Sequence, residues 1–314
     1  MVMFQKRSGS VSVFVHAAGI CESNNVGEGT RIWAFAHVLG GAHIGRDCNI
    51  CDHVFIENDV VIGDAVTIKS GVQLWDGVRL GHRVFVGPNA SFTNDLFPRS
   101  RRYPGSFLQT TVEDHASVGA NATILPGVRI GYQAMIGAGA VVVNDVPARS
   151  IVVGNPGRVV GYADAIEEEK AAGALEDSGV HMVRLNSHSD ARGRLIAAET
   201  TALPFEPKRL FLVDSVSSGA ARGGHAHRSC HQLLVAVAGQ MKVAVDDGRR
   251  ARVVVMDTPE FGWHLPPMIW SMQFGHTNGA VLLVMASHPY DRSDYVSDYA
   301  EFINLAHRNE NKQS

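Results

Sequence analysis

The stretch IGRDCNICDHVFIENDVVIGDAVTIKSGVQLWDGVRLG, residues 44–81, decides the fold of the first half of this chain. A branched aliphatic residue occupies every sixth position in it, namely Ile44, Ile50, Ile56, Ile62, Ile68, Leu74 and Leu80. Neither the 3.6-residue period of a helix nor the two-residue alternation of a strand produces a strict period of six. A solenoid does, because each short strand ends at a corner and the next aliphatic side chain points inward again.

The six-residue period extends well beyond this stretch. It begins at Val26, runs to Phe92, resumes at Val112 and ends at Val142, so that eighteen positions obey it. The 32 glycines beside only 7% aromatic residues agree with a fold of many tight turns. The sequence therefore predicts a β-solenoid across most of the first 160 or so residues.

Composition excludes several classes of protein. A chain of 314 residues corresponds to about two domains, and 45% hydrophobic residues with a net charge of −3 are typical of globular proteins. We expect neither nucleic acid nor a membrane as a partner, because charge is balanced and no apolar run approaches 18 residues. The N-terminal apolar stretch is too short for a signal peptide, and four cysteines without framework spacing favour a cytoplasmic protein.

The repeat resembles that of the hexapeptide-repeat acyltransferases, which form left-handed parallel β-helices, and residues 44–81 resemble the branch that acetylates amino groups on nucleotide sugars. The resemblance covers about residues 23–161 and implies six triangular coils, acetyl-CoA as cosubstrate and a homotrimer. The tail VPARSIVVGNPGRVVG, residues 146–161, is similar to the segment that lies beside coenzyme A in that family. The residues implied to bind coenzyme A are Gly119, Ala120, Gly137, Ala138, Asn155, Pro156 and Arg158.

The repeat is interrupted by TNDLFPRSRRYPGSFLQTT, residues 93–111, and insertions on rigid scaffolds often carry function. The resemblance implies that Asn94 and Asp95 lie at the site of the acceptor amine, with Glu57 and Trp75 as further substrate-binding residues. His115 is either a general base for the transfer or a histidine that only packs at the rim.

After Gly161 the period stops. The segment YADAIEEEKAAGALEDSG, residues 162–179, predicts a short helical linker, and alternating strands with turns between them follow from Val180. Many short strands without long helices predict an antiparallel barrel or sandwich. We therefore expect an all-β protein with a β-helix domain over residues 1–161, a linker over 162–179 and a barrel domain over 180–314.

The segment GAARGGHAHRSCHQLLVAVAG, residues 219–239, resembles the first signature of the cupin barrels. Metal-binding cupins have a glutamate where this chain has Gln232, and Trp270 stands where the second signature supplies a histidine. We therefore expect no resident metal, although a site built from His225, His227 and His231 remains a weaker alternative.

His225 and His227 are two residues apart on a predicted strand, so both imidazoles lie on one face and can enter the barrel mouth. An imidazole titrates near neutral pH and can remove a proton next to a carbonyl. We therefore expect at least one catalytic histidine here, with Arg222 three residues upstream, while the other histidine is either structural or assists.

Three segments, residues 208–216, 221–232 and 287–302, look like the sugar 3,4-ketoisomerases that act on dTDP-4-keto-6-deoxyglucose. The resemblance implies that His225 abstracts the proton at C3, giving an enediol(ate), and that His227 is its partner or proton shuttle. Arg222 and Arg209 would hold the developing oxyanion or the diphosphate. Tyr290 would donate a hydroxyl near the sugar, or would only pack in the barrel.

Together the two halves imply steps one and three of one pathway. The barrel would make a 3-keto sugar, a separate pyridoxal-phosphate aminotransferase would convert it to the 3-amine, and the β-helix would acetylate that amine. The product would be a dTDP-3-acetamido-3,6-dideoxyhexose, of galacto or gluco configuration, for a surface polysaccharide such as O-antigen. Two alternatives remain: an isomerase whose β-helix only trimerises it, and an acetyltransferase carrying a sugar-nucleotide-sensing barrel.

Overall fold

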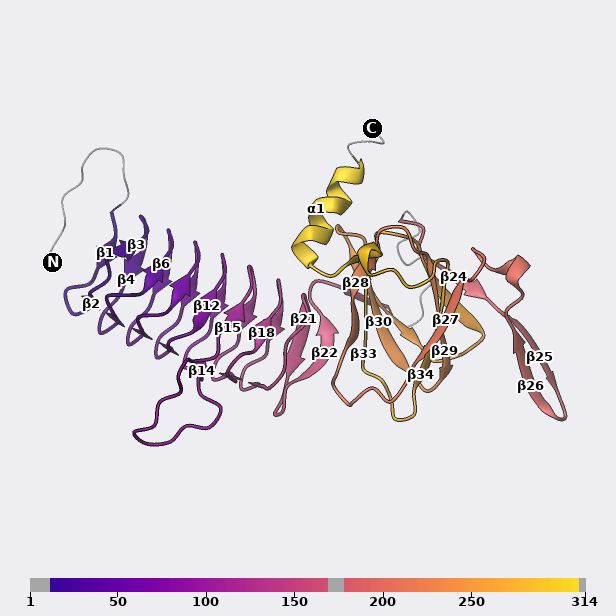
Figure 1. Ribbon diagram of the computed structural model, residues 1–314, viewed down its shortest axis with the longest axis horizontal. Coiled ribbons are helices and arrows are strands. Elements are labelled where there is room, and N and C mark those ends of the chain that lie inside the picture. The colour runs from indigo at the N-terminus through magenta and orange to yellow at the C-terminus, as the bar shows by residue number, and fades with distance from the viewer. Residues whose placement is uncertain (1–11, 169–177, 311–314) are drawn as a thin grey trace. The chain divides into compact units, whose positions relative to one another are not determined.

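The computed structural model describes residues 12–168 and 178–310 and divides into two compact units, Met1–Ala163 and Asp164–Ser314. Among the described residues, no helix combines the length and the hydropathy needed to cross a membrane. We describe each unit by itself (Figure 1).

The first unit is a solenoid of three parallel sheets built from very short strands. The first sheet contains β1 (Phe14–Val15), β4 (Arg31–Ile32), β7 (Asn49–Ile50), β10 (Thr67–Ile68), β13 (Phe85–Val86), β16 (Ser117–Val118), β19 (Met135–Ile136), β21 (Ser150–Val153) and β22 (Arg158–Tyr162). The second contains β2 (Ile20–Cys21), β5 (His37–Val38), β8 (Phe55–Ile56), β11 (Gln73–Leu74), β14 (Ser91–Phe92), β17 (Thr123–Ile124) and β20 (Val141–Val142). The third contains β3 (Asn25–Val26), β6 (His43–Ile44), β9 (Val61–Ile62), β12 (Val78–Leu80), β15 (Thr110–Val112) and β18 (Arg129–Ile130).

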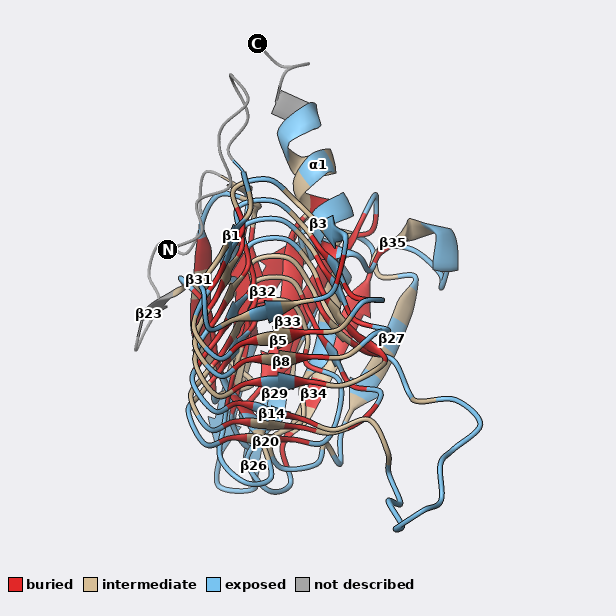
Figure 2. Cartoon of the chain, turned by 90° about the vertical axis from the view of Figure 1, so that its left-hand side faces the viewer, coloured by how far each residue is buried: buried red, intermediate tan, exposed pale blue. Residues whose placement is uncertain are grey.

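The six-residue period places its aliphatic side chains in the core of the solenoid. Ile50 pairs with Ile68, which pairs with Val86, and all three are fully buried. Figure 2 shows these buried positions as red segments that recur on successive turns. The predicted solenoid is confirmed, because one aliphatic stack runs through each sheet.

The solenoid has about eight turns rather than the six that the resemblance implied. The additional turns come from β1, β2 and β21, whose backbones continue the hydrogen bonding although their side chains do not keep the six-residue pattern. β22 then pairs with β21 in the antiparallel direction. This reversal ends the parallel stack.

Many corners use left-handed backbone conformations at residues other than glycine. The φ values lie between 56° and 60° at Phe35, Asp47, His53 and Ala65. Residues other than glycine rarely adopt this backbone conformation. Each of these corner residues donates its backbone N–H to a carbonyl oxygen of the preceding turn. The Asp47 N–H, for example, donates to Glu28 O. Repeated stacking therefore compensates for the local cost of the conformation.

The insertion over residues 93–109 leaves the coil after β14 and returns at β15 (Figure 1). β12 nevertheless pairs with β15 in register, with Val78 opposite Thr110 and Leu80 opposite Val112. The stack therefore continues across the insertion without a shift.

The prediction of a helical linker over residues 162–179 is wrong for the part of it that the structure describes. Ile166–Glu168 forms strand β23, which pairs in parallel with β31 (Ala251–Met256) of the second unit. Residues 169–177, where the rest of that helix was expected, lie outside the described residues. Pairing with an available strand edge outweighs the helical propensity of the Ala- and Glu-rich segment.

The second unit is a barrel of two sheets, as the alternating pattern predicts. One sheet contains β23, β31, β30 (Met241–Asp246), β33 (Trp270–Phe274), β28 (Arg222–His227) and β35 (Tyr295–Val296). The other contains β24 (His181–Arg184), β32 (Phe261–Leu265), β29 (Gln232–Ala238), β34 (Val281–Ala286) and β27 (Arg209–Val213). A separate hairpin pairs β25 (Asn186–Asp190) with β26 (Gly193–Ala197), and two short 3-10 helices are η2 (Thr200–Ala202) and η3 (Arg292–Asp294).

Alternate residues of the barrel strands form the apolar interior. Leu234, Val243, Val254 and Leu282 belong to one buried cluster, whereas Leu233 belongs to a second cluster on the outer face of β29. The helix α1 (Tyr299–Glu310), which the sequence analysis did not anticipate, covers part of the other sheet with Phe302 fully buried.

Candidate active sites

A bulge in β28 sets the direction of the candidate catalytic histidines. Gly223 and Gly224 have φ values of 78° and 71°, and the pairing with β33 shifts register between Gly223 and His225. A Cβ on Gly223 would lie 2.8 Å from the Ser271 carbonyl oxygen, so glycine is required there. The shift pairs His225 with Ser271 and Arg222 with Gln273.

This pairing turns the histidines toward the inside of the barrel. Ser271 pairs with Val245, which belongs to the buried interior cluster, and residues paired across two strands share a face. His225 therefore faces inward, and His227 follows it on the same face. The two rings meet edge to face, with their centroids 5.1 Å apart.

Each ring nitrogen of His227 has a defined partner. Nδ1 lies 2.8 Å from Asp294 Oδ2, and Nε2 lies 3.1 Å from the Gln232 amide nitrogen. Because the ionised carboxylate can only accept, Nδ1 carries the proton, and Nε2 accepts from the amide. The glutamine that replaces the cupin glutamate thus serves as a hydrogen-bond donor to His227.

Burial governs the charge of both imidazoles. Burial and, to a lesser extent, the positive charge of a protonated His227 lower the pKa of His225 to about 4. Burial also lowers the pKa of His227, although Asp294 opposes this shift. Burial of Asp294 raises its pKa, but the hydrogen bonds from Ser229 and His227 outweigh this and leave the pKa lowered. His225 is therefore a neutral base at physiological pH.

Tyr295 lies against both histidines. Its ring centroid is 4.8 Å from that of His225 and 4.4 Å from that of His227. Asp294, one residue earlier, ends η3 and accepts hydrogen bonds from both the N–H and the hydroxyl of Ser229. Neither Asp294 nor Tyr295 was predicted as a site residue, although both belong to the YDRSDY segment, residues 290–295, within the stretch that suggested the family.

Arg209 and Tyr290 line a narrow hollow beside His227. The Arg209 guanidinium carbon lies 4.5 Å from the centre of the Phe211 ring and 5.1 Å from that of Tyr290. The hollow has a volume of about 10 Å³, enough for a single water, and Tyr290 at its mouth is 62% exposed. Both predicted residues therefore lie close to His227.

Arg222 begins β28, three residues before His225, and is exposed. Its pairing with Gln273 places it on the inward face of the strand. Burial lowers the pKa of His276, and the positive charge of Arg222 acts in the same direction. His276 lines a larger cavity of about 660 Å³ formed by residues 214–218 and 276–281. Arg209 therefore acts electrostatically on His227, whereas Arg222 acts on His276.

Trp270 does not face the barrel interior, contrary to its expected place in the second cupin signature. Its ring contacts Tyr299 and Phe302 of α1, because it lies on the outer face of β33, and the inward position belongs to Ser271. His231, the third histidine of the alternative metal site, bonds instead to His264, with Nδ1 3.0 Å from Nε2.

In the solenoid, three of the predicted acceptor-site residues come together through one residue that the sequence analysis missed. The Asp76 N–H donates to Glu57 Oε2 at 2.7 Å, and the Asn94 amide donates to the Asp76 carbonyl oxygen at 3.2 Å. Trp75, beside Asp76, packs on Phe55 with ring centroids 5.6 Å apart. The chain offers no signal for Asp76 beyond its place one turn from both partners.

Asp95 and His115 have other contacts. Asp95 Oδ1 accepts a hydrogen bond from the Phe97 N–H within the insertion. The His115 ring lies 5.4 Å from that of Tyr132 and has a left-handed corner conformation. His115 is therefore a partly buried corner residue whose role in transfer stays a prediction.

The predicted coenzyme A residues form a column on successive turns. A Cβ on Gly119 would lie 2.5 Å from the Ala138 backbone nitrogen, which places Gly119 and Ala120 directly against Gly137 and Ala138. Asn155, Pro156 and Arg158 lie in and after the exposed turn between β21 and β22, and the Gly157 N–H donates to Val141 O. The small residues of this column let the backbones of successive turns pack closely.

Comparisons with known proteins agree with the division of the chain into a solenoid and a barrel. The family described as WxcM-like, C-terminal matches residues 178–307, the bacterial transferase hexapeptide family matches 25–58, and the hexapeptide repeat of succinyl-transferase matches 109–143. A TDP-4-oxo-6-deoxy-alpha-D-glucose-3,4-oxoisomerase from Aneurinibacillus thermoaerophilus is 33% identical over 114 residues, which are 36% of this chain and 82% of the relative.

A dTDP-3-amino-3,6-dideoxy-alpha-D-galactopyranose 3-N-acetyltransferase from the same organism is 55% identical over 155 residues, 49% of this chain and 81% of the relative. Among solved structures, a sugar 3,4-ketoisomerase from Thermoanaerobacterium thermosaccharolyticum in complex with TDP is 30% identical, with a TM-score of 0.41, over 41% of this chain and 96% of that one.

A hexapeptide solenoid joined to a barrel with paired inward histidines, together with the two relatives, defines a bifunctional isomerase and acyltransferase. The chain belongs to the sugar 3,4-ketoisomerase family through its barrel and to the hexapeptide-repeat sugar N-acetyltransferase family through its solenoid.

Proposed function

We propose that the barrel converts dTDP-4-keto-6-deoxyglucose into the 3-keto isomer and that the solenoid acetylates the derived 3-amino sugar with acetyl-CoA. The observation that carries this proposal is the pair of relatives, each covered over more than four fifths of its length, whose names place both reactions around carbon 3 of a 6-deoxy nucleotide sugar. Because the transferase relative acts on a galactopyranose, we propose the galacto configuration for this acceptor.

In the isomerisation, His225 is the base that removes the C3 proton. Its pKa of about 4 keeps it neutral, and one ring nitrogen bonds the backbone of Gly223, which leaves the other with its lone pair. The resulting enediol(ate) is reprotonated at C4. His227 is a less direct candidate, because Asp294 and Gln232 occupy both its nitrogens, and it serves as partner or proton shuttle.

The charged and aromatic groups around the histidines bind the substrate. Arg222, on the face of His225, holds the developing oxyanion, and Arg209 beside Tyr290 holds the diphosphate. Tyr290 swings from the mouth of the hollow and donates its hydroxyl to the sugar. Tyr295 keeps both imidazoles in place.

In the transfer, the Glu57–Asp76–Asn94 cluster positions the acceptor amine, with Trp75 and Asp95 at its edge. Acetyl-CoA lies along the small-residue column, from Gly119 and Ala120 to the turn that holds Asn155 and Pro156, with Arg158 beside it. Alignment of the amine and the thioester supplies most of the rate enhancement. The proton leaves with the coenzyme A sulfur or through His115.

We further propose a homotrimer, since small-residue columns on exposed solenoid faces suit a ligand shared between neighbouring copies. A pyridoxal-phosphate aminotransferase must act between the two reactions, because the isomerase forms a ketone and the transferase needs an amine. Dependence on acetyl-CoA and four free cysteines favour the cytoplasm.

Two assays on the full chain test the proposal. Solvent deuterium incorporation into dTDP-4-keto-6-deoxyglucose reports isomerisation, and thiol release from acetyl-CoA with dTDP-3-amino-3,6-dideoxygalactose reports transfer. We expect both signals. Isomerisation without thiol release would leave the solenoid as a scaffold, and thiol release without deuterium exchange would leave the barrel as a sensing module.

A further inference from the structure

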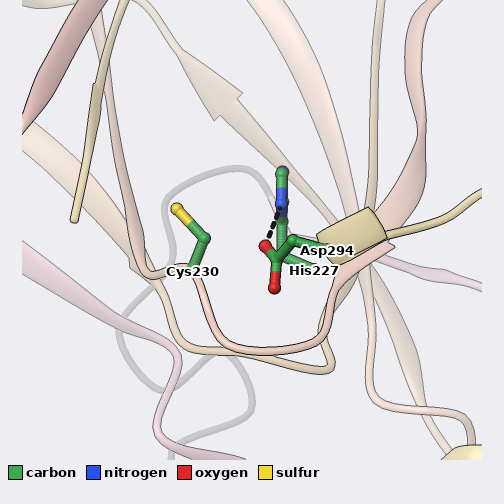
Figure 3. Close-up of side chains that lie close together, drawn as sticks. All are labelled: His227, Cys230 and Asp294. Carbon is green, nitrogen blue, oxygen red and sulfur yellow. Dashed lines mark hydrogen bonds and ion pairs between the residues drawn. The ribbon is translucent and has the colours of Figure 1, made fainter. Parts of the chain in front are cut away.

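A buried cluster of three metal-ligand side chains lies at the edge of the barrel site. His227, Cys230 and Asp294 place one ligand atom each within 4.8 Å of the other two, and this is the one such group of at least three among the described residues (Figure 3). The side chains of His227 and Asp294 are 9% and 11% exposed, and Cys230 is buried as well.

The backbone around the cluster is tightly held. The Arg228 N–H donates to Asp294 O, while the Ser229 N–H and hydroxyl donate to Asp294 Oδ1. His231 follows Cys230 in the chain and donates its N–H to the Ser287 hydroxyl. These bonds tie the loop that carries Cys230 to η3 and to Ser287, which follows β34, so the backbone holds the three side chains near each other.

The chemistry of the three donors favours zinc. Imidazole nitrogen, thiolate sulfur and carboxylate oxygen are its usual ligands, and three protein ligands with one open position make a tetrahedral site. Tetrahedral zinc needs ligand atoms roughly 3–4 Å apart, so small side-chain rotations from the present separations suffice. The three side chains line the small hollow that His288 and Tyr290 also border, which has room for a water as a fourth ligand.

This group differs from the metal site of the cupin signature. That site would use inward histidines together with residue 232, which here is a glutamine that donates to His227 Nε2. Asp294 instead faces Nδ1, the opposite nitrogen of the same ring. A metal here would replace the Nδ1 proton while Gln232 keeps its place.

We propose that His227, Cys230 and Asp294 form an inhibitory zinc site. Binding forms bonds from Zn²⁺ to His227 Nδ1, Cys230 Sγ and an Asp294 oxygen, and it releases the Nδ1 proton and the Cys230 thiol proton to solvent. The effect on rate rests on the proposed isomerase function, because zinc removes His227 from proton transfer. Metal binding itself does not depend on that function.

The binding experiment uses the full chain after treatment with EDTA and its removal. Titration with CoCl₂ should give a sulfur-to-cobalt charge-transfer absorption that saturates at about one equivalent and disappears on addition of ZnCl₂. Cys230→Ser should abolish this absorption, whereas the matched Cys51→Ser, a half-buried cysteine of the solenoid, should retain it. An absorption that persists in Cys230→Ser, or is lost in Cys51→Ser, would overturn the assignment.

The rate experiment compares deuterium exchange in ZnCl₂ with that in EDTA for each variant separately. We expect zinc to lower the wild-type rate by roughly tenfold or more, and to have much less effect in Cys230→Ser. Cobalt binding through Cys230 with an unchanged zinc-to-EDTA rate ratio would overturn the inhibitory role. If the EDTA-treated wild type shows no isomerisation at all, the proposed function fails, and the cobalt spectrum alone still decides the metal site.

Discussion

The solenoid and the barrel assemble their polar groups over very different distances in sequence. In the solenoid, Glu57, Asp76 and Asn94 are 18 or 19 residues apart, one turn each, and they meet because successive turns stack. In the barrel, His227 meets Asp294 across 67 residues and several strand pairings. A periodic stack positions a site through local geometry, whereas the barrel site depends on closure of the whole unit.

His225→Asn should produce the largest difference between the two units, because it should affect the reaction in the barrel and not the one in the solenoid. Loss of the general base should slow deuterium exchange by about two to four decades, while thiol release in the solenoid stays unchanged. The exposed His188→Asn on β25 is the matched control and should alter neither rate. A parallel fall of both activities in His225→Asn would show a folding defect instead of lost chemistry.

Ile68→Ala should reveal the local nature of the solenoid. The side chain is fully buried, so truncation should lower the free energy of unfolding of this unit by about 2–5 kcal/mol. Hydrogen exchange should accelerate around β7, β10 and β13 and not in the barrel. The matched variant in the barrel core is Leu234→Ala, which should accelerate hydrogen exchange throughout that unit. If exchange accelerated over an equally large part of the unit in both variants, the difference between a local solenoid and a cooperative barrel would be refuted.

Asn94→Ala should affect the transfer alone. It removes the amide that bonds the Asp76 carbonyl, and misplacement of the acceptor should slow thiol release by about tenfold to a hundredfold. Deuterium exchange in the barrel should not change. Asn144→Ala, an exposed residue near the end of the solenoid, serves as the control, and an unchanged transfer rate in Asn94→Ala would move the acceptor site elsewhere.

His264→Phe should produce the smallest effect, on acid stability. Burial lowers the pKa of His264 to about 4, helped by the positive charges of protonated His181 on β24 and His231 before β29. The unfolded chain binds this proton below about pH 6.5, so the histidine costs stability as the pH falls toward 4. The variant should therefore lose about 1 kcal/mol less between pH 7 and pH 5 in urea unfolding, a modest figure because solvent partly screens the site. A steeper loss than in the wild type would contradict the sign.

Sequence periodicity predicted the solenoid because its core repeats locally, and the two-residue spacing predicted that His225 and His227 share a face. The extra turns escaped prediction, since β1 and β21 are held by backbone pairing and not by the aliphatic pattern. Asp294 and the outward position of Trp270 also escaped it. Both depend on strand register between distant segments, and a shift of one residue reverses which face a side chain occupies.

The uninterrupted pairing of β12 with β15 has an evolutionary consequence. Since β12 and β15 pair in register on either side of residues 93–109, the length of that excursion can change while the parallel ladder continues. The residues that we propose for acceptor binding, Asn94 and Asp95, lie at its start, so acceptor preference can diverge among homologous proteins while the supporting prism stays constant.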